Sequence, residues 1–531
     1  MAMNFDVLIA NGKIIDGTGN PWYKADIGIK ESKIVRIRKP IKDGAYKIID
    51  AQSLDVAPGF IDTHSHSGLM LLAEPLAEAK LRQGITTEVV GVDGLSPTPI
   101  RSEYAAQMRK YLAGLDGNPN IDWDWTRIRD YLHKVERAGP GTNVAALAGN
   151  GAIRLTVIGF EDRPATPREI QQMREVTEQC VLDGAFGVSS GLIYPPSMFA
   201  DTNELIEICK VVARYDGCYV THMRGESDAL IQSVEEAITI GEKSGCKVII
   251  SHFKAVGKDN WGKVKETIRM VNEARARGID VTCDQYPYTA GSTMLSALLP
   301  PWSLSGGIEK MLHHLRDPAT RERLKKEIYD GLPRWEDLAR IAGWNNIIVS
   351  YCKNNKDFEG KNLAEIASIK GKDPADSLFE ILLDENAEAS MILHLASEDD
   401  VRTIMQHPAV MVCTDGLMGG KPHPRLYGAC PRILGHYVRE EKLLRLEEAI
   451  RKMTSLPATR LGIRDRGLIA EGMYADITIF NPDTIIDKGT YQDPRQFPDG
   501  IEYVLVNGQL AVEHDQRTET RSGKALRKKL V

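Results

Sequence analysis

The feature that most constrains the fold of this 531-residue chain is an alternation of short β-branched runs with helical stretches. Between the runs lie segments such as 204–215, where Leu205, Ile208 and Val212 repeat at helical spacing. Repeated strand–helix units form a parallel sheet, and eight of them predict an α/β fold, the closed (β/α)8 TIM-type barrel. The eight runs are residues 59–64, 86–91, 144–150, 186–192, 218–224, 247–254, 281–288 and 410–416.

Both ends of the chain are β-rich. Residues 7–16 and 503–512 each carry an Asn-Gly pair between apolar runs, which is the strongest short signal for a hairpin. Residues 475–480 add an alternating strand. We expect the two ends to pair into one small β-domain of residues 1–58 and 468–531, beside a barrel domain of residues 59–467. Two unrelated hairpins are the alternative.

A long gap separates the seventh run from the eighth, at residues 289–409. In a barrel, an insertion of this length after a strand usually covers the mouth of the active site, because long loops in compact domains are commonly functional. We therefore expect a lid insertion after the seventh strand, at residues 290–345.

Charge and composition exclude several classes of protein. Lys+Arg 67 against Asp+Glu 73 gives a net charge of −6, so no basic excess favours a nucleic-acid partner. No uncharged apolar stretch is long enough to span a membrane. Residues 1–13 lack the features of a signal peptide, and eight scattered cysteines form no CxxC pair. We expect a cytoplasmic protein with a small-molecule substrate; a homo-oligomer stays open.

Four histidines occupy matching places near the ends of predicted strands. His64 and His66 follow the first run and point the same way, as residues i and i+2 of a strand do. His222 lies near the end of the fifth run and His252 near the end of the sixth. The carboxyl ends of parallel barrel strands meet at one mouth, so four imidazoles can converge there as ligands of a first-row metal. One HxH pair alone would be weak evidence.

The eighth run ends in Cys413-Thr414-Asp415-Gly416. A carboxylate at that place could bind metal and accept a proton from a water molecule that the metal activates. Asp415 is therefore the candidate catalytic acid/base, beside a divalent metal ion such as Zn²⁺.

This pattern resembles the amidohydrolase superfamily, whose members hydrolyse amides, cyclic amides and esters in a metal-bearing (β/α)8 barrel flanked by a β-domain. The resemblance narrows to the D-aminoacylase, or N-acyl-D-amino-acid deacylase, family and covers nearly the whole chain. The motifs that carry it are GVSSGLIYPP (187–196), THMRGE (221–226), SHFKAVG (251–257), DQYPYTAGST (284–293) and KPHPRLYGACPRILG (421–435).

The resemblance assigns roles to single residues. It implies that His222 and His252 hold a tightly bound zinc ion, and that His64 and His66 form a second, weaker metal position. Asp415 corresponds to the acid/base.

The resemblance also implies a substrate subsite. Lys254, Tyr286 and Arg425 match residues that hold the α-carboxylate of the substrate, and these groups suit a carboxylate chemically. Tyr194 and Ser292 lie in motifs that line the same pocket. Packing for Tyr194 and a loop cap for Ser292 are equal alternatives.

Two departures from the family pattern concern the metal. The family usually carries a cysteine ligand in a turn after the second strand, where this chain has Asp93. A carboxylate can replace the thiolate, and we expect Asp93 to be a ligand, with a simple turn residue as the alternative. Gly68 stands where the family often has an acidic residue. Both departures leave the number of metal ions open.

The expected function is metal-dependent hydrolysis of N-acyl-D-amino acids or closely related D-configured peptides. One alternative is a cyclic-amide hydrolase of the hydantoinase or dihydroorotase kind, or a dipeptidase. Cyclic-amide enzymes commonly use a carboxylated lysine after the fourth strand, and residues 186–196 contain none. The remote alternative is a non-catalytic barrel scaffold. The acyl group, the side-chain preference and the D or L preference do not follow from residue types.

Overall fold

The barrel strands coincide with the eight runs expected from the sequence. The computed structural model describes residues 3–333 and 335–530. Within these ranges the barrel strands are β6 (Phe60–Asp62), β7 (Ile85–Val90), β8 (Asn143–Ala146) with its continuation β9 (Ala148–Gly149), β10 (Gly187–Gly191), β11 (Cys218–His222), β12 (Lys247–Ile250), β13 (Val281–Gln285) and β17 (Val410–Val412).

All neighbouring barrel strands pair in parallel. β8 and β9 carry the third strand from one sheet segment into the next, and a parallel bridge between Ser65 and Gly416 joins the first strand to the last. The predicted TIM-type barrel is therefore confirmed.

Apolar residues fill both sides of the barrel wall. Ile61, Val220 and Ile249 belong to one buried cluster, whereas Val248 and Ile250 belong to the large cluster shared with the helices. Successive residues of a strand point to opposite faces, so a strand buried on both faces must be apolar throughout. This requirement is the reason that the strands appear in the sequence as short continuous apolar runs.

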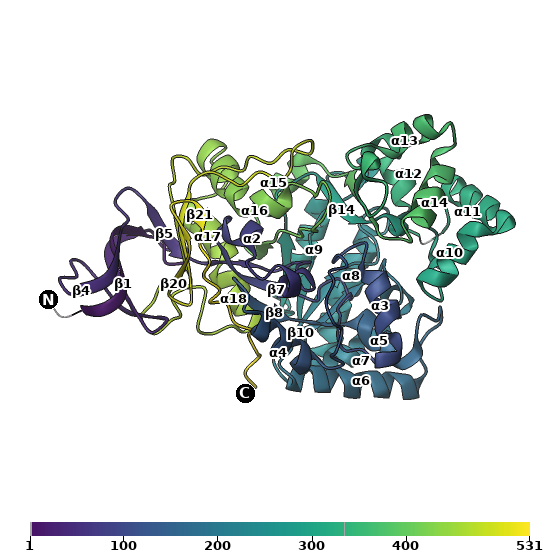
Figure 1. Ribbon diagram of the computed structural model, residues 1–531. Helices are drawn as coiled ribbons and strands as arrows, with labels where there is room; N and C mark the ends of the chain where they lie inside the picture. The colour runs from purple at the N-terminus through teal and green to yellow at the C-terminus, as the bar shows by residue number, and fades with distance from the viewer. Residues whose placement is uncertain (1–2, 334, 531) are drawn as a thin grey trace.

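Helices surround the strands, as Figure 1 shows. They are α1 (Met70–Ala73), α2 (Glu78–Leu81), α3 (Ala105–Leu112), α4 (Ile128–Ala138), α5 (Asn150–Ile158), α6 (Pro167–Leu182), α7 (Thr202–Ala213), α8 (Leu230–Ser244), α9 (Val264–Ala276), α15 (Glu398–Met405), α16 (Arg425–Arg432) with the π-helix Ile433–Glu440, α17 (Leu446–Met453) and α18 (Ser455–Leu461). Within the described ranges, no helix combines the length and apolar character needed to cross a bilayer.

The two ends of the chain share one sheet, in the order β21-β20-β19-β18-β5-β1-β2-β3, with β4 paired to β1. In Figure 1 the purple first strands and the yellow last strands lie side by side. The predicted β-domain built from both ends is confirmed. Its strands are β1 (Met3–Ile14), β2 (Tyr23–Lys30), β3 (Lys33–Arg38), β4 (Gly44–Asp50), β5 (Asp55–Pro58), β18 (Ile477–Phe480), β19 (Ile501–Val506), β20 (Gln509–Glu513) and β21 (Gln516–Arg517).

The two Asn-Gly pairs behave differently. Asn507-Gly508 forms the expected hairpin turn between β19 and β20. The hairpin expected at Asn11-Gly12 is wrong, because β1 continues through it as one strand. β2 pairs with β1 on both sides of this point, so the left-handed Asn11, with φ of 61°, is accommodated as an irregularity in the register.

The segment between β13 and β17 forms a unit of its own, on the side of the molecule away from β1 and β4 in Figure 1. An antiparallel sheet in the order β14-β16-β15 supports helices α10 to α14. The unit returns along β16, beyond residue 345; its role as a lid and the domain boundaries stay predictions. The elements are β14 (Ala290–Met294), α10 (Ile308–Arg316), α11 (Pro318–Asp330), α12 (Leu338–Ala342), β15 (Ile347–Cys352), α13 (Leu363–Lys370), α14 (Pro374–Asp384) and β16 (Ala389–His394).

A buried ion-pair network joins the first and last barrel strands. The Lys80 ammonium lies 2.7 Å from Asp62 Oδ2 and donates to Thr414 Oγ1 at 2.7 Å. Asp62 also accepts the backbone N–H of Thr414 at 2.9 Å and its hydroxyl at 2.6 Å. Asp62 precedes His64 by two residues, and Thr414 directly precedes Asp415. The network therefore fixes the backbone positions from which the His64 and Asp415 side chains extend.

We expect Lys80→Met to lower the stability of the protein by about 3–5 kcal/mol, because it leaves Asp62 and Glu88 buried without their cation. The midpoint of unfolding in urea measures the change. Lys326→Met, the same substitution at an exposed position of α11, is the control. Equal midpoints for the two variants would contradict this role of Lys80.

Candidate metal centre and substrate pocket

The six residues predicted to bind metal or transfer protons lie together at the carboxyl ends of the barrel strands. All six side chains are buried. They reach this place from five strands: His64 and His66 follow β6, Asp93 follows β7, His222 ends β11, His252 follows β12 and Asp415 follows β17.

The donor atoms of this cluster are spaced like the ligands of a metal ion. His64 Nε2 lies 3.4 Å from Asp93 Oδ1 and 3.6 Å from Asp415 Oδ1. His66 Nε2 lies 3.2 Å from Asp415 Oδ1, and His252 Nε2 lies 2.9 Å from His222 Nδ1. Two ligands of a tetrahedral zinc ion, each about 2.0–2.1 Å from it, are about 3.3–3.4 Å apart. The spacing therefore fits a metal centre.

Several buried polar atoms in the cluster have no hydrogen-bond partner within the described residues. They are both ring nitrogens of His64, Nε2 of His66, Nε2 of His222 and Oδ1 of Asp93. Buried polar atoms nearly always have a hydrogen-bond partner. Several such atoms without a partner at one place therefore indicate a binding site for a ligand such as a metal ion. Imidazole and carboxylate donors suit zinc and other first-row divalent metals, so these residues could hold one or two such ions.

The backbone of the cluster is unusual at three of its members. Asp93, His252 and Asp415 have φ of 55°, 34° and 49°, in the left-handed region that residues other than glycine rarely adopt. A Cβ atom at Gly191 would lie 2.2 Å from the carbonyl oxygen of Asp93, so glycine there lets the Asp93 turn close onto β10. Such conformations cost free energy and concentrate at functional sites.

Two carboxylates that the sequence reading missed orient the histidines. His66 Nδ1 lies 2.8 Å from Asp116 Oδ1, and His252 Nδ1 lies 3.0 Å from Glu226 Oε1. Such contacts fix the tautomer and orientation of a metal-binding imidazole. Glu226 stands in the quoted THMRGE motif and could have been found there. Asp116 lies in a loop without a motif, and no signal in the sequence identifies it.

The protonation of the cluster follows from burial and charge. Burial lowers the pKa of His222 to about 4, so its imidazole is neutral and offers a lone pair. Burial opposes the charged form of Asp93, but His64, His252 and His222 together outweigh it and hold the pKa of that carboxyl well below its usual range. Burial disfavours protonated His66, yet Asp116 and Asp415 raise its pKa to about 10. A metal ion competes with that proton for the same nitrogen.

The predicted substrate-binding residues lie beside the metal cluster. Lys254, Tyr286, Tyr194 and Ser292 line one cavity, together with Asp93, His222, His252 and Asp415. The Lys254 ammonium lies 2.7 Å from Glu226 Oε1 and 5.6 Å from the centre of the Tyr286 ring.

Arg425 lies behind that wall and is fully buried. Its guanidinium stacks 4.3 Å from the Tyr286 ring centre and reaches Asp415 Oδ2 at 3.0 Å. Its Nη2 donates to the Ser292 carbonyl oxygen at 3.2 Å. Arg425 therefore joins the candidate acid/base to the wall of the cavity.

Tyr194 and Ser292 use their hydroxyls within the protein. Tyr194 pairs with the Thr293 hydroxyl at 2.7 Å, and its ring lies edge-on to His222 with centres 5.3 Å apart. Ser292 donates to the Met391 carbonyl oxygen at 2.8 Å, which ties β14 to β16. Both residues thus line the cavity while holding its walls together.

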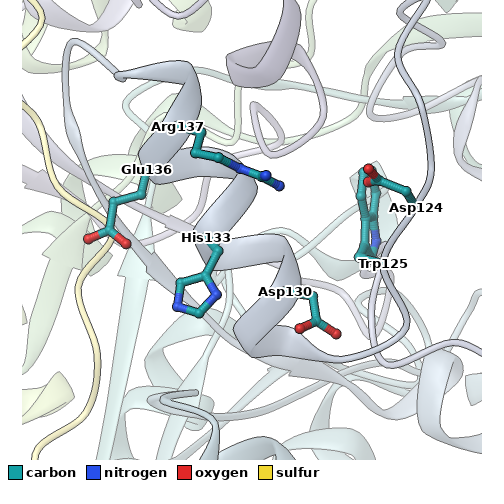
Figure 2. A pocket seen from close by; sticks show the side chains of 6 residues that line it. All are labelled: Asp124, Trp125, Asp130, His133, Glu136 and Arg137. Carbon is teal, nitrogen blue, oxygen red and sulfur yellow. The ribbon is translucent and has the colours of Figure 1, made fainter.

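A wider surface hollow lies along α4, away from this chemistry. Figure 2 shows its lining residues on α4 and on the loop before it. Asp124 there is paired with Lys134, and no member of the metal cluster lines the hollow. Its lining residues are Asp124, Trp125, Asp130, His133, Glu136 and Arg137.

Comparison with known proteins finds similar sequences along nearly the whole chain. The model of the Amidohydrolase family matches residues 312–512. The D-aminoacylase of Alcaligenes xylosoxydans xylosoxydans is 34% identical over 98% of this chain and 97% of its own length. The N-acyl-D-glutamate deacylase of the same organism is also 34% identical, over 99% of this chain and 98% of its own length.

A solved structure shares the whole architecture. The N-acyl-D-glutamate deacylase of Bordetella bronchiseptica, complexed with zinc and a phosphonate inhibitor that mimics the tetrahedral intermediate, superposes with a TM-score of 0.83. It is 33% identical to this chain, and the match covers 98% of this chain and 99% of that one.

The geometry yields a test of Asp93. We expect Asp93→Ala to purify with less bound metal, because it removes one carboxylate from the cluster around His64 and His252. Asp93→Cys should restore zinc, since a thiolate is a good zinc ligand. Elemental analysis of the purified variants measures the metal. A full complement of metal in Asp93→Ala would show that Asp93 is only a turn residue.

Proposed function

Because the chain belongs to the D-aminoacylase family of amidohydrolases, we propose that it hydrolyses the amide bond of N-acyl-D-amino acids. The observation that carries the proposal is one cavity with two kinds of group. Metal-ligating side chains, His222 and His252, line it together with Lys254, whose charge suits a carboxylate. An N-acyl amino acid carries an amide and a carboxylate that are close enough to meet both.

The metal ligands and Asp415 carry the hydrolytic step. A divalent ion held by the histidines and Asp93 would supply Lewis acidity and lower the pKa of water. Asp415 Oδ1 faces His66 Nε2 at 3.2 Å, while its Oδ2 is held by Arg425. In this position Asp415 can take a proton from the attacking water and donate it to the nitrogen of the leaving amino acid.

The cationic side of the cavity would orient the substrate. Lys254 can pair with the α-carboxylate, and the Tyr286 hydroxyl can donate to it. Arg425 supports this side by stacking on Tyr286 from behind. Holding the carboxylate here fixes the amide against the metal cluster, and such positioning lowers the barrier of a reaction by removing freedom of motion in advance.

The alternatives have less support. The fourth barrel strand, β10, reads GVSSG and has no lysine that could be carboxylated, as the cyclic-amide enzymes commonly require. A non-catalytic scaffold has less support, because buried imidazole nitrogens without hydrogen-bond partners and left-handed residues in one cluster cost stability and concentrate at functional sites.

The proposed function is tested by hydrolysis of N-formyl, N-acetyl and longer N-acyl derivatives of D- and L-amino acids by the metal-loaded protein. We expect the D-amino acids to be released faster. We also expect a loss of at least about 10-fold in kcat/KM when the α-carboxylate is masked as an amide, because Lys254 and the Tyr286 hydroxyl would then meet a neutral group in place of a negative charge. Equal kcat/KM for acid and amide would reject this substrate class.

A second prediction concerns the acid/base. Asp415→Asn should fold and keep its metal but lose about 10²–10⁴-fold in kcat, which is the usual contribution of a general acid or base. The same substitution at the exposed Asp399 serves as the control and should leave kcat unchanged. If kcat of Asp415→Asn stays within a few-fold of the unaltered protein, the proton is carried by another group.

A further inference from the structure

We propose that this chain selects N-acyl-D-amino acids with an uncharged, apolar side chain and rejects those with an acidic one. The inference rests on the proposed function and names the substrate class of the same cavity. Overall similarity does not decide the matter, because a D-aminoacylase and an N-acyl-D-glutamate deacylase are both 34% identical to this chain. The lining of the cavity does.

Aliphatic side chains form much of the wall that remains after the catalytic groups are assigned. With the amide at the metal cluster and the α-carboxylate at Lys254, the side chain of the substrate faces this remaining wall. Leu338, Leu393 and Leu395 come from the insertion between β13 and β17, and Ile193 and Val256 come from barrel loops. Burying an apolar side chain among such groups is favourable because it removes apolar surface from water.

Two acidic side chains, Glu226 and Glu336, line the same cavity. The two carboxylate oxygens of Glu336 accept the backbone N–H of Glu226 at 2.8 and 3.0 Å. Burial and the neighbouring Glu226 raise the pKa of Glu336 to about 7, so Glu336 is fully charged only above that pH, where it adds a second buried negative charge to the cavity. An acidic substrate side chain would add a third carboxylate.

No spare cation would compensate that charge. Of the described residues that line the cavity, Lys254 is the one lysine or arginine, and it is already paired with Glu226 at 2.7 Å. In the proposed function the same ammonium also meets the α-carboxylate. Placing like charges together costs several kcal/mol when no counter-ion is present, which discriminates strongly between substrates of equal size.

The closing experiment compares substrates with apolar, polar and acidic side chains, of which glutamine and glutamate differ in charge alone. The metal-loaded protein is assayed at about pH 8.5, where Glu336 is ionised, with N-acetyl-D-leucine, N-acetyl-D-methionine, N-acetyl-D-glutamine and N-acetyl-D-glutamate. We expect kcat/KM for leucine and methionine to exceed that for glutamate by at least about 10-fold. Glutamine, which has the shape of glutamate without its charge, should be hydrolysed faster than glutamate.

Glu336→Gln identifies the group responsible. It keeps an oxygen that accepts the Glu226 N–H but removes the charge, so the glutamine-to-glutamate ratio of kcat/KM should fall by about 10-fold. Glu309→Gln removes a highly exposed charge from the same insertion and should leave the ratio unchanged. A change in the ratio for Glu309→Gln as large as that for Glu336→Gln would overturn the assignment to Glu336.

The outcomes separate this inference from the proposed function. If the unaltered protein hydrolyses N-acetyl-D-glutamate as well as N-acetyl-D-leucine, the inference is wrong and the proposed function stands. If Glu336→Gln leaves the ratio unchanged, the rejection of acids by Glu336 is wrong. If none of the N-acyl-D-amino acids is hydrolysed, the proposed function is wrong and the inference falls with it. The substrate series on the unaltered protein decides the inference even where Glu336→Gln does not fold.

Discussion

Closure of the barrel between its first and last strands is the constraint on which the rest of the site depends. The backbone N–H of Asp415 donates to the carbonyl oxygen of His64 at 2.9 Å, which joins segments about 350 residues apart. Directly below, Asp62 is held by Lys80 and Thr414. Because the ladder closes there, the candidate acid/base has a fixed place against the histidines, and rigid elements hold catalytic groups more precisely than free loops do.

The site itself opposes the stability of the fold. Buried imidazoles and carboxylates lose hydration, and the three left-handed residues Asp93, His252 and Asp415 add strain. Orienting carboxylates such as Asp116 and Glu226 offset part of this cost by pairing with the outer ring nitrogens. The ring nitrogens that face the centre of the cluster still have no hydrogen-bond partner among the described residues, and a bound cation is the group that would pair with them most directly.

The sequence predicts the barrel and the cluster well because both follow from local patterns. A strand buried on both faces must be apolar, and a ligand at its carboxyl end must follow it within a few residues, as His222 and His252 do. The hairpin predicted at Asn11 does not form, because the partner strands decide whether an Asn-Gly pair makes a turn or a bulge, and the local sequence does not reveal those strands. Glu336 could not be predicted from the sequence, because it lies in no motif and its contact, Glu226, is 110 positions away in the chain.

In the proposed function, chemistry and selectivity come from different parts of the chain. The metal ligands and Asp415 follow barrel strands, whereas Glu336, Leu338 and Leu393 belong to the insertion. The barrel ladder fixes the ligands, so substitutions in the insertion can change which side chain the cavity accepts without moving a donor atom of the metal cluster. Such a separation suits a family whose members include both a D-aminoacylase and an N-acyl-D-glutamate deacylase.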